Sequence, residues 1–178
     1  MNSTFFFRRY IPWIIVFGYV VLLYATLGYV RCLSDALRAR GILGSVTLAI
    51  FFLLCGAVLA MLRRLSSFAS RLLIVLLLGI SVLSSFFLPF PEERLHLVEY
   101  SILGWLLGRA LARSGKWPVC WGVGVLLVWL IGYGDELIQW FLPNRVFDVR
   151  DIFLNGIAGM GGLAIFAIFA QEVSGSPS

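Results

Sequence analysis

The chain has 178 residues, of which 61% are hydrophobic and only 13% are charged. Soluble proteins carry about 25% charged residues, so this composition excludes an ordinary soluble domain. The formal net charge of +5 comes almost entirely from arginine, because Lys116 is the only lysine. We interpret these charges as topology-setting residues of membrane loops and expect no nucleic-acid partner.

The hydrophobic residues gather in six blocks, each long enough for a helix to cross the roughly 30 Å hydrocarbon core of a bilayer. The expected helices cover residues 11–30, 42–62, 72–88, 95–112, 118–142 and 151–170. Continuous apolar runs favour helices over barrel strands, which would alternate and be shorter. We therefore predict an all-α, polytopic membrane helix bundle of about six transmembrane helices with short loops. The first block is too long for a signal peptide, so we expect it to be retained.

Two prolines divide the chain after the third block, because Pro89 and Pro91 end a helix. We expect three N-terminal transmembrane helices in residues 1–90, a core of three more in residues 91–171, and a polar tail in residues 172–178. Lysine and arginine slightly favour a cytoplasmic N-terminus, which would place the third and fifth connections outside.

A small set of polar residues lies in or beside the last three hydrophobic blocks. Ionised groups in a bilayer cost several kcal/mol unless they pair or bind something, so such residues are candidate functional groups. The third and fifth connections of a six-helix chain lie on the same side of the membrane, so we expect these residues to converge there. The candidates are His96, Glu99, Asp135, Glu136, Gln139, Arg145, Asp148, Asp151 and Asn155.

Helical spacing supports this convergence. His96 and Glu99 are three residues apart and therefore share a helix face, and Asp135 and Gln139 are four apart. Gly104 lies four residues before another glycine, a spacing that allows a second helix to approach closely. We expect three helices in contact through glycine, with their polar stripes turned inward at one end.

Each of these groups has a structural alternative. His96 and Glu99 would either stabilise the start of a helix or act as an acid–base pair. Arg145 would either lock a loop or grip a phosphate or carboxylate. We interpret Glu92 and Glu93 as a solvated hinge.

A metal site is a further alternative. No closed zinc site is expected, because no second His or nearby Cys is available. Clustered carboxylates would suit a divalent cation such as Mg²⁺ or Ca²⁺, with Glu99, Asp135 and Glu136 joined by Asp148 or Asp151. We leave the cofactor open and assign no metal ligand.

The ordered motifs resemble those of VanZ-like membrane proteins. They are His96-x-x-Glu99-Tyr100, Asp135-Glu136-x-x-Gln139, and the run Pro143-Asn-Arg145-x-x-Asp148-x-x-Asp151-x-x-x-Asn155-Gly156-x-x-Gly159. The resemblance covers residues 90 to 165 and implies a small multi-pass protein of the bacterial cell membrane. It also implies an association with the cell envelope, because the founding member confers low-level resistance to the glycopeptide teicoplanin without remaking the peptidoglycan stem peptide.

Three kinds of function remain open. In the first, the protein would act on or bind an outer-leaflet lipid or a lipid-linked envelope substrate. In the second, it would be a carrier or flippase subunit. In the third, it would alter antibiotic access without catalysis. In the first case we assign catalytic roles to His96, Glu99, Asp135, Glu136 and Asp151. Substrate binding would fall to Gln139, Arg145, Asp148 and Asn155.

Overall fold

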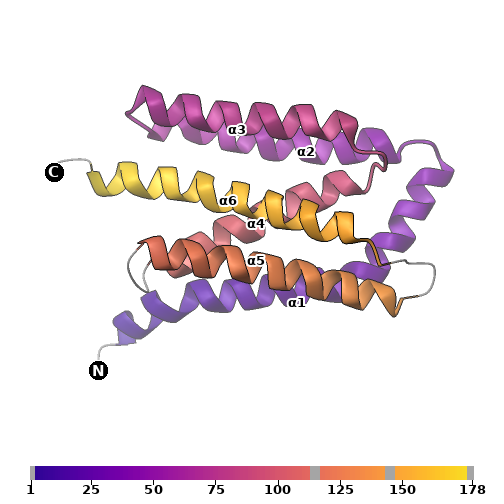
Figure 1. The fold of residues 1–178 in the computed structure, drawn as a ribbon, viewed down its shortest axis with the longest axis horizontal. Coiled ribbons are helices and arrows are strands. Elements are labelled where there is room, and N and C mark those ends of the chain that lie inside the picture. The colour runs from indigo at the N-terminus through magenta and orange to yellow at the C-terminus, as the bar shows by residue number, and fades with distance from the viewer. Residues whose placement is uncertain (1–2, 113–116, 143–146, 176–178) are drawn as a thin grey trace.

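The protein is a bundle of long antiparallel helices in the computed structural model, which describes residues 3–112, 117–142 and 147–175. No strand occurs in these ranges, which confirms the predicted all-α class. The start of α1 and the end of α6 lie at the same end of the bundle (Figure 1). The helices are α1 (Ser3–Ala39), α2 (Leu43–Met61), α3 (Phe68–Phe87), α4 (Glu93–Leu111), α5 (Trp117–Trp140) and α6 (Val149–Gly175), with a 3-10 turn η1 (Leu62–Arg64) after α2.

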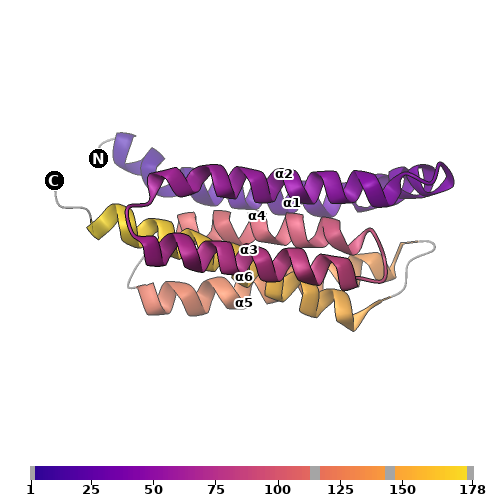
Figure 2. The ribbon, with the colours of Figure 1, turned by 90° about the horizontal axis from the view of Figure 1, so that it is seen from above.

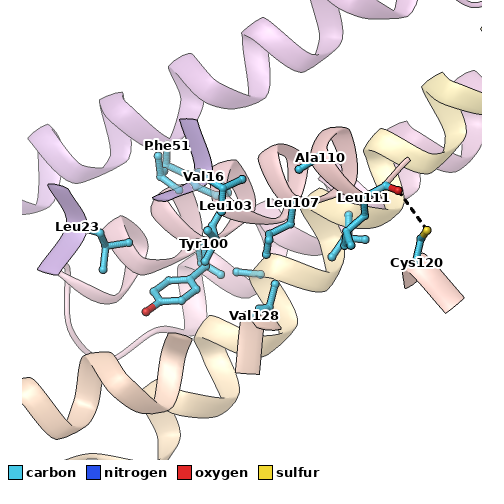
Figure 3. Packing of buried hydrophobic residues seen from close by; sticks show 14 of the residues in the cluster. Val16, Leu23, Phe51, Tyr100, Leu103, Leu107, Ala110, Leu111, Cys120 and Val128 are labelled. Atoms are coloured by element: carbon cyan, nitrogen blue, oxygen red, sulfur yellow. Dashed lines mark hydrogen bonds between the residues drawn. The ribbon is translucent and has the colours of Figure 1, made fainter. Parts of the chain in front are cut away.

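Five of these helices are long and apolar enough to cross a membrane, namely α1, α2, α3, α5 and α6. The remaining helix, α4, contacts α1, α2, α5 and α6 and lies in the middle of the bundle (Figure 2). Its side chains Tyr100, Leu103 and Leu107 are fully buried. Figure 3 shows them among the other side chains of the hydrophobic cluster. Because other helices rather than lipid surround α4, this helix tolerates more polar residues than its neighbours. The chain is thus a multi-pass membrane protein.

The first helix is longer than its hydrophobic block, so the predicted end near Val30 is wrong. Arg31 and Asp35 form an ion pair one turn apart, with 3.3 Å between Nε and Oδ2, which extends the helix beyond its apolar part. The helix closes at Gly41, which has φ 69°, a left-handed conformation that glycine adopts without steric cost. The N–H of Ile42 then bonds back to the carbonyl of Leu37 at 3.1 Å.

The closest helix contact joins α4 to α6 through glycine, as the spacing predicted. A Cβ atom added to Gly104 would lie 1.9 Å from the carbonyl oxygen of Gly159, and one added to Gly162 would lie 1.9 Å from that of Ser101. The Ser101 hydroxyl also donates to the carbonyl of Ala158 at 3.3 Å. The two backbones therefore touch directly, and α4 and α6 form one unit.

The third helix has few buried side chains and is held at both ends by polar contacts. The Glu172 carboxylate accepts hydrogen bonds from the hydroxyls of Ser66 (2.6 Å) and Ser70 (2.8 Å) and from two backbone N–H groups at the start of α3. At the other end, Arg94 Nε donates to the carbonyl of Ser85 at 3.1 Å. Helix α6 continues to Gly175, past its expected end at Ala170, and so brings Glu172 to α3.

Candidate functional site

The predicted polar residues that the structure describes lie near the end of the bundle where α4 and α6 begin and α5 ends (Figure 1). Most of these side chains are buried between the helices and have little contact with solvent. The relative exposures are 6% for His96, 0% for Asp135, Glu136 and Asn155, and 1% for Gln139. The expected convergence of α4, α5 and α6 is confirmed.

The central contact is a buried pair formed by His96 of α4 and Asp135 of α5. The imidazole Nδ1 lies 3.8 Å from the carboxylate Oδ2. Asp135 stands five residues before the end of α5, which places it about 8 Å inside the bundle at 1.5 Å per residue. The rings of His96 and Tyr100 are 6.4 Å apart, and Tyr100 and Tyr24 both interact electrostatically with Asp135.

The adjacent carboxylate, Glu136, holds the structure of the α5–α6 connection. Its Oε1 accepts a hydrogen bond from Gln139 Nε2 at 3.1 Å, and its Oε2 accepts one from the backbone N–H of Asp148 at 3.0 Å. Asp148 in turn precedes α6 and accepts the backbone N–H of Arg150 on Oδ1 at 2.8 Å, as an N-cap residue does. Three of the predicted site residues are therefore used to start α6.

The two acids at the start of α4, Glu92 and Glu93, are not a solvated hinge, so that interpretation is wrong. Glu92 forms an ion pair with Arg38 of α1, and its side chain is only 13% exposed. Glu93 Oε1 lies 3.8 Å from a guanidinium nitrogen of Arg150 in α6, and its side chain is 6% exposed. Periodicity missed this because both acids lie next to a proline turn, where no helical pattern indicates what a side chain faces.

The environment of Glu93 favours its protonated form. Burial raises the pKa of this carboxyl above its usual value, and the nearby Asp151 and Asp148 raise it further. Arg150 and a backbone hydrogen bond act in the opposite direction. Glu93 therefore joins the start of α4 to the start of α6 through a pair whose charge depends on pH.

Two predicted residues lie at the margin of this cluster, and one lies outside the described residues. Glu99 is half-buried on α4, where its backbone carbonyl accepts the hydroxyl of Tyr19 at 2.9 Å. Asp151 is half-buried in the first turn of α6, near Glu93. Arg145 falls in the part of the α5–α6 connection that the structure does not describe.

Helix α1 contributes tyrosines that sequence reasoning missed. The Tyr24 hydroxyl donates to the carbonyl of Ile131 in α5 at 2.7 Å. A Cβ atom added to Gly134, the residue before Asp135, would lie 2.7 Å from the same hydroxyl. A tyrosine within an apolar block is typical of a membrane interface, so its spacing alone does not indicate a buried contact. The site is thus built from four helices, including one from the N-terminal half.

The described residues can also be examined for side chains that would bind a metal ion. They contain no group of three or more His, Cys, Asp or Glu side chains that could hold a metal ion. The expected oxygen-rich cation site therefore has no support in this part of the chain. An imidazole beside a carboxylate can hold or move a proton.

Comparison with known proteins gives one match. No curated protein and no solved structure matches the chain significantly. Residues 90–170 match the model of the VanZ/LLP1 family. This range includes all of α4 and α5, most of α6, and the His96–Asp135 and Glu136–Asp148 contacts. The chain is thus a multi-pass membrane protein that carries a VanZ-like domain in residues 90–170.

Proposed function

We propose that this protein binds and acts on an outer-leaflet lipid or lipid-linked envelope substrate at the end of the bundle where α4 begins, and that it thereby lowers susceptibility to teicoplanin. The observation that supports the proposal is the buried His96–Asp135 pair, 3.8 Å apart, in the domain that matches the family. Structural ion pairs are usually placed at helix surfaces, whereas ionisable groups inside a membrane protein mark sites of function.

Asp135 is the candidate general base of this site. Both oxygens of the neighbouring Glu136 accept hydrogen bonds from Gln139 and from the backbone of Asp148, which suits a structural role. Asp135 instead faces an imidazole and two tyrosines, groups that exchange protons or orient a reacting oxygen. In this proposal His96 stabilises the charge that develops on the substrate, and Arg150, whose side chain is 62% exposed, attracts the anionic headgroup.

A second candidate is a proton-coupled carrier or flippase subunit. The specific observation in its favour is that Asp135 is completely buried among α1, α4 and α5, as proton-binding carboxylates of membrane carriers are. The two candidates share the same pair but differ in the product. An enzyme changes the covalent structure of the lipid, whereas a carrier moves an unaltered lipid between leaflets.

The experiment that tests the proposal compares Asp135→Asn with Asp35→Asn in a teicoplanin-susceptible bacterial host. Asp35 is a matched control because its side chain is 53% exposed and pairs with Arg31 on the surface of α1. Membrane levels of each variant are measured by immunoblot, teicoplanin susceptibility by broth dilution, and lipid extracts by mass spectrometry.

We expect wild type and Asp35→Asn to raise the inhibitory concentration of teicoplanin and Asp135→Asn to have no effect at equal protein level. A lipid species that changes only with the active proteins would support the enzyme. Reconstituted protein that moves a labelled lipid without altering it would support the carrier. Full tolerance with Asp135→Asn would contradict both.

A further inference from the structure

Helix α1 is much longer than the crossing of a bilayer requires. Its 37 residues extend about 56 Å at 1.5 Å per residue, whereas the hydrocarbon core is about 30 Å thick. Residues 10–28 alone cover about 28 Å and are therefore sufficient to cross that core. The remaining residues, 29–39, form about three further turns, which we call the end segment of α1.

The last turns of α1 do not continue in the direction of the other helices. They run obliquely across the end of the bundle toward the start of α2 (Figure 1). The ion pair between Arg38 and Glu92, the residue before α4, fixes them to the bundle. The other long helices follow the membrane normal, so a segment that crosses the end of the bundle lies close to the plane of the membrane surface.

The end segment has two exposed faces of opposite character. Tyr29 and Leu33 are four residues apart and share an apolar face, with exposures of 81% and 59%. Arg31 and Asp35 each follow one of them by two residues, which places the charged face about 200° further around the helix. An apolar face opposite a charged face is typical of a helix that lies in the membrane interface, where tyrosine is also enriched.

We propose that the end segment of α1 is an interfacial helix that lies in the lipid headgroup layer. Tyr29 and Leu33 then contact the acyl chains, while Arg31 faces the lipid phosphates and water. Because Arg38 pairs with Glu92, this helix holds the start of α4, and with it the candidate site, at headgroup depth in the same leaflet. The inference goes beyond the proposed function and does not depend on whether the protein alters, moves or only binds a lipid.

A native cysteine allows a test without any substitution. Cys32 lies in the end segment and is exposed, whereas Cys55 and Cys120 are buried, so a thiol-reactive nitroxide should label Cys32. The labelled protein is reconstituted in bilayers of phosphatidylethanolamine and phosphatidylglycerol. Electron paramagnetic resonance then measures its collisions with oxygen, which partitions into lipid, and with a water-soluble nickel chelate.

Two positions on opposite faces provide the matched comparison in a Cys32→Ser background. Leu33→Cys places the label on the apolar face, and Asp35→Cys places it on the charged face at the cost of an exposed ion pair that contributes little to stability. Leu22→Cys, at a position 58% exposed in the crossing part of α1, gives the reference for hydrocarbon. We expect a several-fold higher oxygen-to-nickel ratio at position 33 than at position 35, and an intermediate ratio for the label on native Cys32.

Each of three other results would overturn the inference. Preference for nickel at both positions 33 and 35 would place the end segment in water. Ratios at both positions as high as at position 22 would place it in the hydrocarbon. Dipolar broadening of the Cys32 label that disappears on dilution with unlabelled protein would show that a second copy of the chain covers the apolar face. If Leu33→Cys does not fold, the label on native Cys32 still distinguishes these depths.

The connection to the candidate site has its own test. Arg38→Gln removes the ion pair with Glu92 and should make the Cys32 label more mobile. Arg40→Gln, at an exposed position just after the helix, is the matched control and should leave the line shape as in wild type. Equal line shapes in the two variants would show that Glu92 does not hold the end segment and would overturn its connection to α4.

Discussion

Glu136 accepts a hydrogen bond from the backbone N–H of Asp148 at 3.0 Å, so a fully buried carboxylate near the end of α5 fixes the start of α6. The first N–H groups of a helix have no partner within the helix, and an acceptor from another element satisfies them. This contact distinguishes two neighbouring acids, because Glu136 stabilises the fold while Asp135 faces the imidazole of His96.

The variant Glu136→Gln should therefore destabilise the protein more than it changes its activity. It loses the charge that strengthens the bonds to Gln139 and Asp148, and a hydrogen bond to a charged group contributes about 1.5–3 kcal/mol. Thermal unfolding in detergent should show a lower melting temperature. Asp135→Asn should leave the melting temperature unchanged or higher, because it removes a charge that is costly to bury. Equal stability of wild type and Glu136→Gln would refute the structural role.

Replacing either of two adjacent glycines of α6 with alanine should have different effects on the stability of the protein. A Cβ at position 162 would overlap the carbonyl of Ser101, and such overpacking costs about 1–3 kcal/mol or more. A Cβ atom added at position 161 would meet no neighbouring side chain or other helix within 4 Å, so Gly161→Ala should be neutral or stabilising by up to about 1 kcal/mol. The yield of folded, monodisperse protein measures both effects. Similar behaviour of Gly161→Ala and Gly162→Ala would mean that α4 and α6 do not pack as described.

Removing the carboxylate of Glu172 should loosen the start of α3. The variant Glu172→Ala takes away the acceptor for the hydroxyls of Ser66 and Ser70 and for the N–H groups of Ser66 and Ser67. Hydrogen–deuterium exchange should become faster at these amides and remain unchanged within α5. The exposed neighbour Gln171 provides the control, because Gln171→Ala should leave the exchange at α3 as in wild type.

The stability of the protein should fall as the pH rises through the range in which Glu93 loses its proton. Burial and Asp151 raise the pKa of this carboxyl above its ordinary value of 4.5, so the folded state binds its proton more tightly than the unfolded state does. The stabilisation is complete below pH 4.5 and is lost as the pH rises through the folded-state pKa.

Melting temperatures recorded from acid to neutral pH would reveal this contribution. Glu93→Gln cannot ionise and should flatten the slope, whereas Arg150→Gln removes the opposing cation and should make the slope steeper. An unchanged slope in Glu93→Gln would assign the pH dependence to another group.

The sequence predicts most of the fold because hydropathy and chain length determine which segments cross a bilayer. The shared end of the third and fifth connections follows from counting the spans, and the Gly104 contact follows from spacing on a helix. Hydropathy could not predict that α1 continues past Val30, because a helix ends where its backbone is capped, here at Gly41. A hydrophobic block therefore gives the minimum length of a helix.

The candidate site was predicted less completely. His96 and Asp135 were identified because ionisable groups are rare in apolar segments. Tyr24 was missed because tyrosine is common in membrane spans and only its hydroxyl, bonded to Ile131, shows that it faces α5. Glu93 was misinterpreted because the burial of the first residue of a helix depends on distant elements, in this case on Arg150 of α6.

The three consecutive residues Glu92, Glu93 and Arg94 contact three different helices, through Arg38 of α1, Arg150 of α6 and the carbonyl of Ser85 in α3. Chimeras that exchange only residues 90–170 would therefore separate Glu92 from Arg38 and Arg94 from Ser85. An exchange of function between proteins that carry this domain should require α1 and α3 to be transferred with it, because both helices contact the charged residues at the start of α4.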